Sequence, residues 1–207
     1  MLISAFICLS LTARAQMEAV DLGLSVKWAS CNLGASAPTE CGDYYAWAET
    51  TPKERYLWET LTYCTDSEGK KLTKYVTDTH YGTVDGKTVL ESADDAATQT
   101  LGGSWRLPTK EECFELWVEC KWKWTKQDGV KGFLVTSKKN GNSIFLPGAG
   151  YYYGKTFYGS GSGAYWSSSL AAGSPSSAYC PCFSPYDAAG TSLGDRCYGR
   201  SIRPVTE

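Results

Sequence analysis

Thiols and carboxylates are the groups in this sequence that could do chemistry, because the chain carries a single histidine, His80. His80 lies in a polar, loop-like stretch with no serine or cysteine motif beside it, so we do not expect it to act as a base. Eight of the nine cysteines follow residue 15: Cys31, Cys41, Cys64, Cys113, Cys120, Cys180, Cys182 and Cys197. The Cys180-Pro181-Cys182 spacing does not match a zinc finger, and we expect neither a metal site nor a cofactor.

A second group, Glu91 with the neighbouring pair Asp94-Asp95, offers carboxylates that could exchange protons or bind Ca²⁺. A solvated turn before Gly102 is the simpler interpretation, and it is the one we favour. With no nucleophile and base in a recognisable pattern, we expect the chain not to be an enzyme.

The charge composition limits the classes of partner that the protein is expected to bind. Twenty Lys and Arg against 22 Asp and Glu give a formal charge of −2, so no basic surface is available for a nucleic acid, and no polybasic run offers a membrane anchor. The apolar run from Leu2 to Leu11, followed by Ala13-Arg14-Ala15, predicts a signal peptide over residues 1–15 and export to the cell envelope or medium. A buried N-terminal strand is the alternative. Residues 16–207 are then expected to form one domain. Export would permit disulfides among the eight cysteines, in pairs that the spacing does not identify.

The sequence predicts one clear helix, around which the rest of this domain is expected to be organised. Thr109 to Glu112 form a capping box, and Cys113, Leu116, Trp117 and Cys120 follow at helical spacing. We expect Trp117 to be buried, with Trp105 and Leu107. Strands are predicted at Val20–Leu33, Tyr44–Trp47, Trp122–Thr125, Gly132–Ser137, Ser143–Leu146 and Tyr151–Tyr153.

Turn signals connect the later strands. Asp128-Gly129 and Asn140-Gly141 predict tight turns of an antiparallel meander. Trp122 and Trp124 alternate with lysines, so both indoles share one face of a strand, which we expect to be a core face rather than a sugar-stacking platform.

Several short motifs occur in an order that resembles the Fibrobacter succinogenes major paralogous (FISUMP) domain. They are Val20–Ala29, Asn32–Gly34, Tyr44–Trp47, Gly103–Thr109, Leu146–Tyr151, Tyr165–Ser169 and Ile202–Val205. The resemblance implies an α+β domain with a C-type lectin-like fold, antiparallel sheets and one or two helices, in a secreted or surface protein of a Gram-negative bacterium. It also implies that the ligand surface lies on the C-terminal strands.

The segment 171–198 contains no Lys, Glu, Gln, Met or Trp, although these types are common elsewhere in the chain. They are the amino acids that no codon ending in a pyrimidine encodes. In this respect the chain resembles the variable proteins of diversity-generating retroelements, in which adenines of a template repeat are mutagenised and the products are written into the last strands of a C-type lectin-like domain. A Gly-, Ala- and Ser-rich surface loop is the plainer alternative. We call residues 171–198 the tract.

The resemblance predicts a recognition surface, bounded by the constant segments around Trp166 and Arg203, for a protein or glycan on another cell or a phage. The contact residues expected on one exposed face of it are Ala171, Ala172, Gly173, Ser174, Ser176, Ser177, Tyr179, Cys180, Cys182, Ser184, Tyr186, Ala188, Ala189, Gly190, Cys197 and Tyr198. If diversification introduced Cys180, Cys182 and Cys197, these thiols are expected to be free or opportunistically paired. The first alternative is a family member with an undiversified envelope, adhesion or glycan-binding role. The second, disfavoured by the cysteine spacing, is an enzyme of the formylglycine-generating type.

Overall fold

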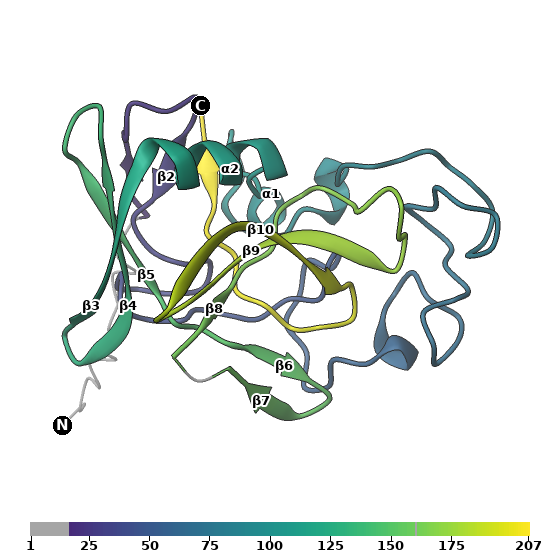
Figure 1. Ribbon diagram of the computed structural model, residues 1–207. Helices are drawn as coiled ribbons and strands as arrows, with labels where there is room; N and C mark the ends of the chain where they lie inside the picture. Colours follow the sequence, from purple (N-terminus) through teal and green to yellow (C-terminus); the bar gives the residue numbers. More distant parts are fainter. Residues whose placement is uncertain (1–16, 160) are drawn as a thin grey trace, which may run out of the picture.

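The computed structural model describes residues 17–159 and 161–207, and these form an α+β domain made mainly of antiparallel strands (Figure 1). The predicted signal peptide lies outside the described residues. The α-helices are α1 (Ala96–Leu101) and α2 (Lys110–Glu119), and short 3₁₀ turns cover Trp58–Thr60 and Ser92–Asp94. The strands are β1 (Ala19–Val20), β2 (Lys27–Ala29), β3 (Cys120–Gln127), β4 (Val130–Ser137), β5 (Ser143–Pro147), β6 (Tyr151–Tyr153), β7 (Thr156–Tyr158), β8 (Gly163–Ala164), β9 (Ser177–Ser184), β10 (Asp187–Asp195) and β11 (Val205–Thr206).

Helix α2 begins where the capping box predicts. The Thr109 side chain accepts a hydrogen bond from the Glu112 amide, and the Glu112 side chain accepts one from the Thr109 amide. Cys113 and Leu116 are buried, as is Leu107 before the helix, whereas Trp105 is only half-buried.

The prediction for Trp117 is wrong, because 39% of this residue is exposed. The buried stripe of α2 follows Cys113 and Leu116 and continues to Cys120 at the start of β3, and Trp117 lies at its edge. One side of the indole lines a cavity of only about 20 Å³ and the rest faces solvent beside Phe114.

The meander is confirmed as the sheet β3-β4-β5. Asp128 and Gly129 have φ angles of 47° and 87°, the left-handed values that a two-residue hairpin turn needs. Trp122 and Trp124 pack against buried Phe133 while Lys121 and Lys123 are exposed, so the core-face interpretation holds.

The predicted strand at Tyr151–Tyr153 forms, but outside the meander. As β6 it pairs with β7 in a separate hairpin.

The N-terminal strands are shorter than predicted. Val20–Leu33 breaks into β1 and β2, because Asp21 accepts a hydrogen bond from the Gly23 amide and closes a turn between them. Strand β2 pairs with β11, so both ends of the described chain share one sheet. Tyr44–Trp47 is not a strand and makes only an isolated bridge from Tyr45 to Arg200.

Two large buried clusters hold the layers together, and a smaller one is formed by Ala46, Tyr56 and Leu61. One lies between α2 and the meander, and the other surrounds Trp47 and Trp166. The β9–β10 hairpin lies between α2, drawn above it, and the β6–β7 hairpin, drawn below (Figure 1). Through its two faces, strand β9 contributes Phe183 to the first cluster and Ala178 and Cys180 to the second.

Candidate functional site

The tract folds as a loop, residues 171–176, followed by the β9–β10 hairpin and a short return to Tyr198. Strand β9 lies in the middle of a sheet, between β8 and β10. Pro181 has no N–H group to donate to that sheet, and β10 carries a bulge opposite it, between Ala189 and Ser192. The bulge shifts the register beside Cys180 and Cys182.

Exposure differs along the tract. Tyr186 at the hairpin tip is 97% exposed and Leu193 is 50% exposed. Ala172 and Gly173 are exposed on the loop. The half-buried members are Ser174, Ser176, Ser177, Tyr179, Cys182, Ser184 and Tyr198. Ala188, Ala189 and Gly190 lie in β10.

Three expected contact residues are buried instead: Ala171, Cys180 and Cys197. Successive residues of a strand point to opposite faces, and Cys180 points with Ala178 into the cluster around Trp166. Those expected contact residues whose side chains the structure describes are therefore not gathered on one exposed face. The loop lies at one end of the hairpin and Tyr186 at the other, while the Tyr179 ring faces α2 beneath the Lys110 ammonium group, 4.8 Å away.

A cavity of about 340 Å³ brings part of the tract together with residues outside it. Cys182, Phe183 and Ser184 of β9 form one wall. The others come from Gly150, Tyr151, Gly159, Ser162, Gly163, Ala164 and Arg200. On one side of the cavity, the Tyr151 ring stacks between the rings of Tyr158 and Tyr198, with centroid distances of 5.5 and 5.3 Å. The cavity thus joins a tract strand to an aromatic stack of the β6–β7 hairpin.

Arg200 is the charged group of this cavity. It is 95% buried, and its guanidinium lies 4.7 Å from the Trp166 ring and 5.5 Å from that of Tyr151. Its Nη1 donates to the Cys182 Sγ at 3.5 Å, and its buried Nε has no hydrogen-bond partner. No carboxylate of the described residues forms an ion pair with it. A Cβ on Gly194 would come within 2.3 Å of Nη2, so a glycine is needed there.

Cys180 and Cys182 stand side by side on β9, with 3.3 Å between their Sγ atoms. A hydrogen bond from Cys180 and the nearby charge of Arg200 outweigh burial and lower the pKa of Cys182. The same contact, with burial, raises the pKa of Cys180. Of the two sulfurs, Cys182 is therefore the one on which the fold favours a thiolate.

We call the segments around Trp166 and Arg203, which flank the tract, the framework. Buried hydrogen bonds hold these segments in place. The indole of Trp166 donates to the Tyr45 carbonyl oxygen at 2.8 Å. Arg203 is 99% buried, and it donates to Asn32 Oδ1 and to the carbonyl oxygens of Ala29, Ser30 and Phe145. Arg196, within the tract, donates to the carbonyl oxygens of Lys74, Tyr75 and Pro175, which ties the loop to the core.

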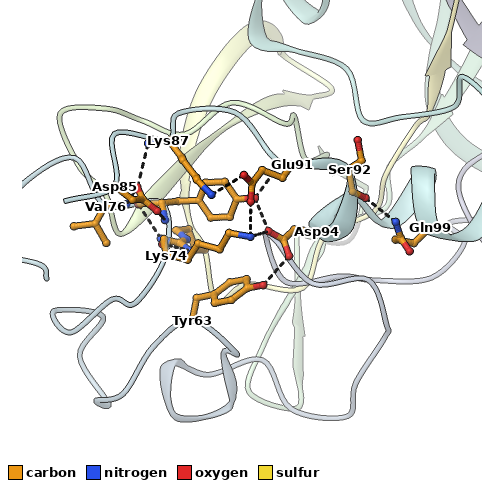
Figure 2. A network of polar contacts seen from close by, with 11 residues as sticks. Tyr63, Lys74, Val76, Asp85, Lys87, Glu91, Ser92, Asp94 and Gln99 are labelled. Carbon is orange, nitrogen blue, oxygen red and sulfur yellow. Dashed lines mark hydrogen bonds and ion pairs between the residues drawn. The ribbon is translucent and has the colours of Figure 1, made fainter. Parts of the chain in front are cut away.

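The carboxylates singled out in the sequence form a structural network, and the solvated-turn prediction is wrong. Asp94 and Asp95 are 6% and 4% exposed. Figure 2 shows Lys74 reaching between Glu91 and Asp94, while the Tyr63 hydroxyl donates to Asp94 at 2.6 Å. Asp95 caps α1 through the Thr98 amide and also accepts from the Leu107 amide. The two aspartates thus fasten the irregular segment before α1 to the core.

The histidine and the cysteines that the sequence offered for chemistry show no metal-binding arrangement in the described residues. His80 is exposed in a loop and its ring contacts Asp78. In the described part of the chain the eight cysteines after residue 15 are all free thiols, including the three in the tract. Within the same residues, no group of three or more His, Cys, Asp or Glu side chains is arranged to hold a metal ion.

No sequence motif marks Arg200 or the Tyr151–Tyr158 stack as part of a site. The available signal was position: Arg200 lies two residues after the end of the tract, and Tyr151 is the last residue of the Leu146–Tyr151 motif.

No known protein family, curated protein or solved structure matches the chain. The resemblance to FISUMP domains and to retroelement variable proteins therefore stays a prediction. Among residues 17–159 and 161–207, no helix is both long and apolar enough to cross a membrane.

Proposed function

We propose that this protein is a secreted or surface-exposed binding protein with a C-type lectin-like fold, whose tract is a recognition surface diversified by a retroelement. The observation that carries the proposal is that the unusual composition covers one whole structural unit together with the segments that flank it. The stretch without Lys, Glu, Gln, Met or Trp runs from Ser167 to Thr206, and it includes the loop, the β9–β10 hairpin and the residues on either side of them.

The framework on either side supports this assignment. Trp166 and Arg203 flank the tract and are held by buried hydrogen bonds. Substitutions at outward positions such as Ala172, Tyr186 and Leu193 would leave those bonds intact. A rigid frame that carries replaceable side chains binds with little loss of conformational entropy.

The outward residues also suit contact with a macromolecule. Leu193 is exposed on β10, which packs against α2, and α2 exposes Phe114, Trp117 and Val118. Exposed apolar side chains next to polar ones are characteristic of interaction sites. A protein or glycan on another cell or on a phage is the partner class that we propose, and no catalytic step is required of the tract. An undiversified adhesion or envelope role for the same domain is the alternative.

Binding can be tested with the purified protein, fluorescently labelled, on a panel of Gram-negative bacteria and phages by flow cytometry. The tract variant is Tyr186→Ala with Leu193→Ala. The control is His80→Ala with Val84→Ala, two residues that are also exposed but lie outside the tract.

For a cell or phage that the wild type binds, we expect the tract variant to bind roughly tenfold more weakly, equivalent to about 1.4 kcal/mol. The control should bind like the wild type, with both melting temperatures unchanged. Equal binding by the tract variant, or loss of binding in the control, would place recognition elsewhere.

A further inference from the structure

Beside the cavity lies a pair of thiols whose arrangement has a chemical consequence of its own. Cys180 and Cys182 are two residues apart on β9 and therefore share one face of the strand. Their Sγ atoms are 3.3 Å apart. Cys180 is fully buried, whereas Cys182 is partly exposed and lines the cavity. A molecule entering the cavity therefore meets the Cys182 sulfur first, with a second sulfur directly behind it.

Arg200 supplies the charge that such a sulfur needs. Its Nη1 contacts the Cys182 Sγ, and none of the carboxylates in the described residues pairs with the guanidinium. A buried cation without a counter-charge lowers the stability of the fold, and a thiolate on Cys182 would supply the missing negative charge. Reactive cysteines are found in partly exposed, electropositive surroundings of this kind.

We propose that Cys182 and Cys180 exchange with a small-molecule disulfide that enters the cavity, with Cys182 as the attacking sulfur and Cys180 as the resolving one. In the first step the Cys182 thiolate attacks one sulfur of the disulfide R–S–S–R. A bond forms between Cys182 and that sulfur, the R–S–S–R bond breaks, and R–S⁻ leaves. In the second step Cys180 gives its proton to R–S⁻ and attacks the Cys182 sulfur, which expels the second R–S⁻.

The products are a Cys180–Cys182 disulfide, one R–SH and one R–S⁻. Two electrons pass from the protein thiols to the small disulfide, and the net charge is unchanged.

The order of the two steps follows from the coupling between the thiols. While Cys182 is a thiolate, its hydrogen bond with Cys180 raises the pKa of the Cys180 thiol and keeps it protonated. Once Cys182 is part of a mixed disulfide, that charge is gone and Arg200 faces Cys180 alone. The second thiol is therefore activated only after the first has reacted.

A bridge between residues two apart on an extended strand is strained, and strained disulfides are easily reduced. The pair is thus suited to cycling between dithiol and disulfide. This chemistry does not depend on whether the tract is diversified, because it rests on Cys180, Cys182, Arg200 and the cavity alone.

The test uses 5,5′-dithiobis(2-nitrobenzoate), an aromatic disulfide, on the reduced full-length protein at pH 6, with modified cysteines mapped by mass spectrometry. Cys41 and Cys64 are internal controls, because they are also partly exposed and burial raises the pKa of each. A lower pKa reduces the nucleophilicity of a thiolate less than it increases the thiolate fraction. We expect Cys182 to react on the order of ten times faster than either control.

The wild type should release two equivalents of nitrothiobenzoate from this site and leave a peptide that contains the Cys180–Cys182 disulfide. Cys180→Ser should release one equivalent and keep the mixed disulfide on Cys182, and Cys182→Ser should lose the fast phase. The proposal is overturned if Cys41 or Cys64 reacts as fast as Cys182, or if the Cys182 adduct persists in the wild type. Site mapping on the wild type decides between these results even if a variant does not fold.

Discussion

Asp94 and Asp95 are adjacent in the chain and both buried, yet their surroundings move their pKa values in opposite directions. Burial alone would raise both. For Asp94, hydrogen bonds from Lys74, Tyr63 and Tyr75 outweigh burial and lower the pKa. For Asp95, burial outweighs the hydrogen bonds from the Thr98 and Leu107 amides and raises the pKa. The fold therefore favours the charged form of Asp94 and disfavours the charged form of Asp95.

The first prediction concerns Asp94→Asn. Because the folded pKa of Asp94 is lowered, its charge stabilises the fold above the unfolded pKa of about 4, and that contribution is lost as the pH falls through the folded value. We expect the variant to be less stable by about 1–3 kcal/mol at pH 7. The difference from wild type should shrink below about pH 4. Urea unfolding across this pH range measures it, and a difference that does not change with pH would contradict the assignment.

The second prediction is the opposite slope for Asp95→Asn. A raised folded pKa means that the folded state binds more protons than the unfolded one between the two pKa values. Wild-type stability should therefore rise relative to the variant as the pH falls from 7 towards about 4. The amide oxygen of Asn can still cap α1, so the helix should persist in both proteins. Parallel slopes for the two aspartate variants would show that their environments do not differ as described.

The third prediction compares two neighbours on α2. Leu116 is buried and Trp117 is 39% exposed. Leu116→Ala should cost about 2–5 kcal/mol of unfolding free energy because it leaves a cavity in the core. Trp117→Ala should cost clearly less, since the indole keeps much of its contact with water in the folded state. Chemical denaturation of both variants gives the comparison, and a larger loss for Trp117 would mean that it belongs to the core after all.

A fourth prediction concerns the cavity wall at Gly163. A Cβ there would lie 2.0 Å from the ring of Phe183, which is itself buried among aromatic side chains. Gly163→Ala should therefore destabilise the protein by about 1–3 kcal/mol through overpacking. Gly173→Ala is the control, because no atom lies within 4 Å of its Cβ position. Equal melting temperatures for the two variants would mean that Phe183 can move aside and that the wall is not fixed.

Local signals explain which parts of the fold could be predicted. The capping box of α2 and the Asp128-Gly129 turn act within four residues, so the helix and the meander follow from the sequence. Trp117 was misplaced because helical spacing puts it beside the buried stripe, and only the packed structure shows on which side of the edge it lies.

The surroundings of the buried carboxylates and of the cavity are formed by residues that lie far apart in the sequence. Asp94 meets Tyr63 and Tyr75 from 31 and 19 residues away, which no local pattern reveals. Arg200 was missed for the same reason, since its setting requires Tyr151, Trp166 and the space left by Gly194. The tract was found because its composition is a property of the sequence alone. Which of its side chains face outward had to come from the pairing of β9 with β8 and β10.

The nucleotide sequence of the gene and its neighbours tests the central claim most directly. If the tract is diversified, its codons should end in pyrimidines far more often than those of the rest of the gene. A near-copy of the tract should lie close by, beside a reverse transcriptase gene, with adenines wherever the two copies differ. Purine-ending codons at the ordinary frequency, with no near-copy in the locus, would contradict the account and leave an undiversified binding domain.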